Sequence, residues 1–274
     1  MANEWDLTYT RYSGLEFDPD EESYLWGMVF NDDGDKFYIV GSENKVFQYT
    51  IGTPWLISTA SYASKYVDIS PEDSLPRGIA FSSDGTKMFM VGSTNNSVFQ
   101  YTLSTAWDVS SANYASKSCD LSSETEDPWG VAFNDDGTTM FITESKQATQ
   151  GKVFQYTLSS AWDVSTASYA EITKELSSYF AKGIYFSDDG GEMFTLETLN
   201  DKVYQYTLST EWDVTVISNV EDYTETEDAS PTSFTMSANG KYFYIGGTIT
   251  DKIYQYSSSQ PVLNKKYPLP PFSS

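Results

Sequence analysis

Short apolar runs separated by turn residues recur along most of this chain. In one stretch, the run Ile79–Phe81 leads to a turn at Asp84 and Gly85, and further runs follow at Met88–Val91 and Val98–Leu103. An Asp-Gly pair suits the positive φ of a tight hairpin. The runs are short and show no 3.6-residue period, so the pattern predicts an all-β protein built from hairpins.

The runs belong to a repeat of about 50 residues, which is typical of propellers and solenoids. A turn glycine recurs at spacings of 51, 52, 53 and 50 residues. These glycines are Gly34, Gly85, Gly137, Gly190 and Gly240. The third run of each copy carries a glutamine: Gln48, Gln100, Gln155, Gln205 and Gln255. A tryptophan follows at Trp55, Trp107, Trp162 and Trp212. Each copy contains four predicted strands, and the first of them should line a central channel.

The fifth tryptophan lies at the opposite end of the chain. Residues 4–8 around Trp5 match the segment around Trp107, whereas the chain leaves the repeat soon after Gln255. A ring needs this offset, because an N-terminal strand in the last blade closes the sheet without a bare edge. We therefore predict a five-bladed β-propeller over residues 1–256, with repeats starting near residues 27, 78, 130, 183 and 233. Residues 4–17 should complete blade five, and residues 257–274 should form a tail.

The first two strands of each copy and the Ser-x-Asp-Gly turn between them resemble YVTN and TolB-like propeller repeats. The complete repeat, written Val-Phe-Gln-Tyr-Thr-Leu-Ser-x-x-Trp-Asp-Val, is similar to arrays in tailed-phage virion proteins and marine bacterial surface proteins. This resemblance implies a virion component, either a tail or fibre adhesin or a decoration protein. WD40 repeats match less well, because the chain has no histidine.

The charge and residue content exclude several classes of function. With 39 acidic and 16 basic residues the net charge is −23, which repels nucleic acid and anionic lipid. The absence of histidine excludes Ser-His-Asp and Cys-His catalytic arrangements. Cys119 is the single cysteine and takes the place of Val67 in the preceding copy, so we expect a packed side chain. We expect no enzymatic activity.

We also expect neither a secretory signal nor a membrane-inserted segment. The N-terminus lacks a basic start and an apolar run, and no stretch approaches 18 apolar residues. The predicted route is therefore synthesis in a host cytoplasm and incorporation into a virus particle.

Differences between the copies suggest one candidate site. The second strand ends in glycine in three copies (Gly41, Gly92 and Gly246), but in Glu144 and Glu197 in copies three and four. These strand ends share one face of a propeller with the loops that lead into the next blade. Two carboxylates there are either solvated rim groups, contacts for a cation or sugar hydroxyls, or a glycosidase pair.

The residue before the glycine of the first strand also varies. It is Trp26, Arg77, Trp129, Lys182 and, in copy five, Thr232. We expect these side chains at the channel mouth on the same face. Exposed aromatic rings near carboxylates suit sugar rings, and the alternative is that the rings plug the channel.

Other motifs have structural explanations. The five glutamine amides should satisfy backbone groups between blades, and the tryptophans should pack as wedges there. The segment Asn31–Asp35 resembles a calcium loop, but Ser42 stands where a glutamate ligand is required, which favours a plain hairpin. The loops between blades are acidic. We expect them to be hydrated, with Ca²⁺ binding as the alternative and no other cofactor.

The C-terminal tail is rich in proline and has charge of the opposite sign to the body. It contains two lysines and no acidic residue, and its prolines should keep it extended. The candidate docking residues are Pro261, Lys265, Lys266, Tyr267, Pro270 and Phe272. They point to a partner virion protein or another copy of this chain, and the alternative is an unstructured end. Three functions remain open: a virion protein that contacts a partner protein or a surface glycan, a free lectin-like module, or a propeller hydrolase or lactonase.

Overall fold

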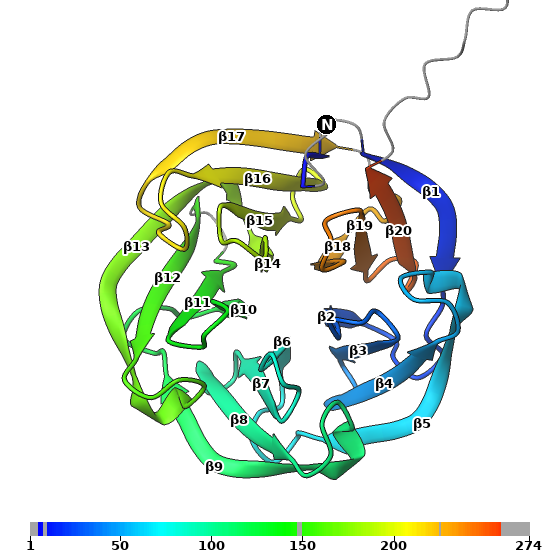
Figure 1. Cartoon of the computed structure of the whole chain (residues 1–274), viewed down its shortest axis with the longest axis horizontal. Coiled ribbons are helices and arrows are strands. Elements are labelled where there is room, and N and C mark those ends of the chain that lie inside the picture. The colour runs from blue at the N-terminus through cyan, green and yellow to red at the C-terminus, as the bar shows by residue number, and fades with distance from the viewer. Residues whose placement is uncertain (1–4, 8–9, 147–149, 225, 259–274) are drawn as a thin grey trace, which may run out of the picture.

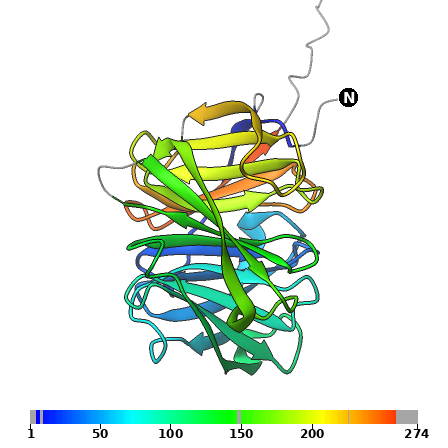
Figure 2. The same ribbon diagram turned by 90° about the vertical axis from the view of Figure 1, so that its left-hand side faces the viewer.

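The computed structural model describes residues 5–7, 10–146, 150–224 and 226–258. They form five antiparallel four-stranded sheets around a central channel (Figure 1). From the side, the strands run between the two faces of the ring (Figure 2). The prediction of an all-β, five-bladed propeller is confirmed.

Each blade contains four strands, here called A to D from the channel outwards. Blade one holds β2 (Leu25–Phe30), β3 (Lys36–Gly41), β4 (Lys45–Ile51) and β5 (Ala60–Asp68). Blade two holds β6 (Pro76–Phe81), β7 (Lys87–Gly92), β8 (Ser97–Leu103) and β9 (Ala112–Asp120). Blade three holds β10 (Pro128–Phe133), β11 (Thr139–Glu144), β12 (Gln150–Leu158) and β13 (Ala167–Tyr179). Blade four holds β14 (Ala181–Phe186), β15 (Glu192–Glu197), β16 (Lys202–Leu208) and β17 (Ile217–Thr224).

Blade five joins the two ends of the chain. It contains β18 (Pro231–Met236), β19 (Tyr242–Gly247), β20 (Ile253–Ser258) and, as its outermost strand, β1 (Thr10–Phe17). Strand β1 pairs antiparallel with β20, with Tyr12 opposite Tyr256 and Phe17 opposite Ile253. Figure 1 shows these first and last strands side by side. The predicted closure by the N-terminal strand is therefore confirmed.

The hydrophobic core lies between neighbouring blades. One cluster contains Tyr38 and Val40 from blade one together with Ile79 and Met88 from blade two. Equivalent clusters join the other neighbours around the ring. Burying one large apolar side chain stabilises a fold by about 1.5–3 kcal/mol, so packing between blades dominates the stability of the ring.

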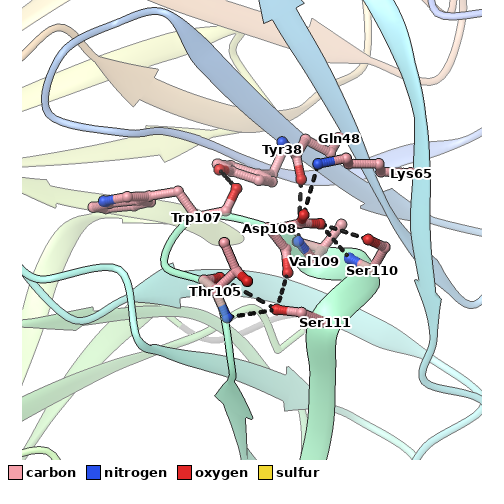
Figure 3. Close-up of polar contacts among 9 residues, drawn as sticks. All are labelled: Tyr38, Gln48, Lys65, Thr105, Trp107, Asp108, Val109, Ser110 and Ser111. Carbon is pink, nitrogen blue, oxygen red and sulfur yellow. Dashed lines mark hydrogen bonds and ion pairs between the residues drawn. The ribbon is translucent and has the colours of Figure 1, made fainter.

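Polar contacts repeat at the same seams. The Gln48 amide oxygen of blade one accepts a hydrogen bond from the Val109 N–H of blade two at 3.1 Å (Figure 3). At the same seam, the Tyr38 hydroxyl donates to the Trp107 carbonyl oxygen. Gln100, Gln205 and Gln255 accept equivalent bonds from Val164, Leu7 and Ile57. The predicted structural role of the glutamines is confirmed at these four seams, whereas the buried amide oxygen of Gln155 has no partner.

The turn glycines provide room for the repeated tryptophans. Gly85 has φ of +66°, and a Cβ atom there would lie 2.3 Å from Cε2 of Trp107. A larger residue would therefore meet both backbone strain and a clash. The Trp107 ring also packs on Phe81 of its own blade, with ring centroids 5.3 Å apart. This repeated contact ties the hairpin between strands A and B to the loop between strands C and D.

Two smaller predictions are also resolved. Asn31–Asp35 forms a hairpin in which Asn31 donates to the Asp35 carboxylate at 2.7 Å. Cys119 is buried in the cluster between blades two and three, and burial raises the pKa of its thiol to about 11.

Helical structure in blades one to three includes single 3₁₀ turns at Ile57–Thr59, Val109–Ser111 and Val164–Thr166. None of the helices in the described ranges has the length and apolar character needed to cross a membrane.

Candidate functional site

One face of the ring carries the ends of the B strands and the loops that enter each blade. In blades one, two and five, an acidic side chain from the entering loop lies against the glycine that ends strand B. The pairs are Glu22 with Gly41, Asp73 with Gly92, and Asp228 with Gly247. A Cβ atom on Gly92 would lie 2.2 Å from Cγ of Asp73, so only glycine leaves room for the carboxylate.

The glycine of blade five differs from the one that the sequence suggested. Pro231 pairs with Gly247, in the same way as Pro76 pairs with Gly92. The equivalent residue is therefore Gly247, and Gly246 lies one position earlier in the strand. The register was wrong by one residue because blade five has two consecutive glycines at this point.

These loop carboxylates hold the backbone of the face in place. Asp73 accepts hydrogen bonds from the N–H groups of Leu75 at 2.7 Å and Asn95 at 2.8 Å, which lie in different loops. Glu22 and Asp228 make corresponding contacts in their own blades. Carboxylates that accept several backbone hydrogen bonds stabilise otherwise unpaired donors. The acidic loops are thus partly buried structural elements.

Glu144 and Glu197 replace these loop acids in blades three and four. Glu144 is 4% exposed and accepts a hydrogen bond from Thr125 Oγ1 at 3.0 Å. Thr125 occupies the loop position that Asp73 holds in blade two. Glu197 is fully buried and accepts from the N–H of Tyr179 at 3.2 Å. In these two blades the buried carboxylate therefore comes from the end of strand B and not from the entering loop.

This position differs from the one we expected, since neither glutamate projects into solvent at the rim. The Glu144 carboxylate also lies 3.9 Å from the Lys152 ammonium, and Glu197 accepts from the Asn200 amide at 3.2 Å. Glu144 is held by groups of blade three and its entering loop, whereas Glu197 of blade four is held by Asn200 and by Tyr179 at the end of β13. The sequence contains a signal for this difference, because copy three has Thr125 in place of the loop carboxylate and Glu144 in place of the strand glycine.

The four variable residues at the channel mouth do come together. The Arg77 guanidinium lies 4.7 Å from the ring centre of Trp26 and 4.2 Å from that of Trp129. The Lys182 ammonium lies 4.2 Å from the Trp129 ring. We call Trp26, Arg77, Trp129 and Lys182 the mouth cluster. Its order alternates aromatic rings and cations, an arrangement stabilised by cation–π attraction.

Trp129 closes the channel. Its side chain is 7% exposed, and its indole N–H lies 3.3 Å from the Trp26 carbonyl oxygen and 3.2 Å from that of Thr232. These carbonyls belong to blades one and five, across the channel from blade three. The alternative that aromatic rings plug the channel thus applies to Trp129. Trp26, Arg77 and Lys182 remain partly exposed.

The two cations of the mouth cluster lie near two carboxylates, Asp73 and Asp127. Burial and repulsion by Arg77 lower the pKa of Lys182 to about 8. Burial likewise lowers the pKa of Arg77 and raises that of Asp127, the carboxylate that interacts with both cations. No hydrogen bond from the Lys182 ammonium is found within the described residues. The mouth therefore holds two cations that are stacked on indoles, on a strongly acidic protein.

Two further sequence predictions concern the C-terminal tail and metal binding. The tail residues Pro261, Lys265, Lys266, Tyr267, Pro270 and Phe272 lie outside the described residues. Over the ranges that are described, no group of three or more acidic or cysteine side chains is arranged to hold a metal ion.

Comparisons with known proteins support the fold. No protein-family model and no curated protein sequence matches the chain. Among solved structures, a chain in a crystal structure of a nidogen/laminin complex aligns with a TM-score of 0.53 at 10% identity. The alignment covers 82% of this chain and 73% of that chain. At this identity the likeness shows the propeller architecture alone, and the resemblance to YVTN, TolB-like and phage repeats stays a prediction.

Proposed function

We propose that this propeller is a non-enzymatic binding and structural module of a phage particle, either a tail or fibre adhesin or a decoration protein. The rigid ring is suited to presenting loops on one face, as propellers do. The mouth cluster offers a contact point on that face. Glu144 and Glu197 are buried and accept hydrogen bonds from neighbouring groups of the protein, which argues against their use as a catalytic carboxylate pair. We therefore propose binding in place of hydrolysis or lactonase chemistry.

The observation that carries the binding proposal is the Lys182 ammonium, which is stacked on Trp129 without a hydrogen-bonded partner among the described residues. Beside it, Arg77 is stacked between two indoles. Aromatic rings bind the apolar faces of sugars, and paired cations bind carboxylates. The preferred ligand is therefore a surface glycan that carries a carboxylate group.

A glycan array with the full chain tests this proposal. We expect acidic glycans to be retained more strongly than neutral ones, and retention to fall at least tenfold in Trp26→Ala and Lys182→Met. Lys45→Met is the matched control, because the Lys45 ammonium also stacks on an aromatic ring, 5.2 Å from Tyr66, but on an outer strand. Glycans that bind all variants equally, or an array without hits, would contradict the assignment.

We propose that the C-terminal tail attaches the propeller to the particle, by docking on other virion proteins or on a second copy of this chain. The support is the sequence: two lysines and four prolines follow an acidic body. A chain that ends at Ser258 should fold normally and fail to enter particles. Normal incorporation of this shortened chain would exclude the tail as the anchor, whereas a full chain that never enters particles would favour the alternative of a free lectin-like module.

A further inference from the structure

The channel is open at the end opposite Trp129. A cavity of about 490 Å³ is lined by the A strands and by the hairpins that follow them. A ring of apolar side chains, one from each blade, separates it from the narrow space beneath the mouth cluster. This ring consists of Met28, Ile79, Val131, Ile184 and Phe234. The cavity opens to solvent, because the hairpin residues at its rim are exposed. We call it the funnel.

Three carboxylates stand at the rim of the funnel. The second residue of the hairpin is Asp32, Asp135 and Asp188 in blades one, three and four, but Ser83 and Ala238 in blades two and five. Partial burial raises the pKa of each aspartate, and repulsion raises it further. For Asp188 the repelling groups include both other rim aspartates. Negative charge is thus concentrated at the entrance without a matching cation among the described residues that line the funnel.

Blade four contributes a tyrosine to the wall of the funnel. Tyr185 lines the cavity, where the other blades have Val29, Ala80, Ala132 and Thr235. Its side chain is partly exposed, and desolvation together with the three rim aspartates raises the pKa of its hydroxyl. The hydroxyl makes no hydrogen bond to the described residues. This hydroxyl is thus available to a ligand in the funnel as a hydrogen-bond donor or acceptor.

The rest of the wall is aromatic and apolar. The indoles of Trp107, Trp162 and Trp212 line the funnel. Indoles attract cations that approach the ring face. A cavity between about 300 and 1,000 Å³ has the size of a small-molecule site. The funnel therefore combines apolar depth, aromatic walls, negative charge at the rim and one free hydroxyl.

We propose that the funnel binds a small organic cation, with an apolar body in the channel and an ammonium or guanidinium group among the rim carboxylates. A single metal ion fits less well, because no three acidic or cysteine side chains of the described residues converge on one point. The net charge of −23 would draw cations toward the protein from solution. The site lies on the opposite face from the mouth cluster, so it is independent of the glycan proposal.

Isothermal titration calorimetry of the full chain with 2-phenylethylamine at pH 7 tests the inference. We expect saturable binding of one amine per chain, and at least tenfold weaker binding of 2-phenylethanol, which has the same apolar body without the charge. Asp188→Asn should weaken amine binding at least fivefold, and Tyr185→Phe should weaken it at least twofold. Asp20→Asn is the control, because it removes one exposed carboxylate from a loop on the other face and should leave amine binding unchanged.

Three results would overturn the proposal. These are the absence of saturable amine binding, equal affinity for amine and alcohol, or equal affinity in Asp188→Asn and Asp20→Asn. Calcium chloride is titrated in parallel, and Ca²⁺ binding that is tighter than amine binding and sensitive to Asp188→Asn would also overturn it. Asp188→Asn is expected to fold, since it relieves repulsion at the rim, and its melting temperature is measured to verify this.

Discussion

At the scale of single residues, one side-chain oxygen recurs as the polar connection between blades. The buried N–H of Val164 would have no acceptor without the amide of Gln100, from which it lies 3.1 Å away. Water cannot easily replace this bond inside a packed seam, so the N–H depends on the glutamine. Gln155 holds the same place in blade three, but its oxygen has no partner. Gln155 therefore serves as a comparison for Gln100 within the same chain.

Replacing each of these two glutamines by methionine should have different consequences. Gln100→Met removes the acceptor of a buried N–H and should lower the free energy of unfolding by about 1–3 kcal/mol. Gln155→Met removes an oxygen that is already unsatisfied and should be neutral or slightly stabilising. Urea unfolding followed by tryptophan fluorescence measures both. Equal losses in the two variants would mean that the hydrogen bond contributes nothing beyond the shape of the side chain.

At the scale of the blades, an ion pair adds a second polar connection at the two seams that follow blades one and two. Lys65 and Lys117 lie opposite Gln48 and Gln100 on strand D, and they form ion pairs with Asp108 and Asp163 of the next blade. In blade three the equivalent residue opposite Gln155 is Ile172. Blade four also lacks the 3₁₀ turn that presents the N–H group at the other seams. Both polar connections are therefore absent at the seam between blades three and four.

Comparison of the copies predicted the strands, the turns and the shared last blade, because spacing and turn chemistry determine these locally. It also placed Trp26 and Lys182 together, since both precede the glycine of strand A. It did not reveal that Glu144 points inward, because that depends on Thr125 in another segment. The rim aspartates such as Asp188 were overlooked for a similar reason, since one hairpin alone looks like an ordinary turn.

At the scale of the whole molecule, the ring is held closed by strand β1 without a covalent link. Trp5 packs against the hairpin glycine of blade five, where a Cβ atom on Gly240 would lie 2.6 Å from Cδ2 of the indole. The Leu7 N–H donates to Gln205 of blade four at 3.1 Å. The N-terminal segment therefore supplies the tryptophan–glycine contact and the hydrogen bond to the glutamine of the preceding blade that the repeat makes at other seams. Its loss would expose β20 as an unpaired edge.

Deleting residues 1–17 should therefore open the ring. Leu7 and Trp5 alone account for about 3 kcal/mol or more at about 1.5–3 kcal/mol per buried apolar side chain. For a domain of this size that corresponds to a fall in melting temperature of about 10 °C. The chain ending at Ser258 is the control and should melt as the full chain does. A synthetic peptide of residues 4–17 should restore the melting temperature in a concentration-dependent way, because a ligand that binds only the folded ring stabilises it. If the deleted chain melted at the original temperature without the peptide, the pairing of β1 with β20 would not be what closes the propeller.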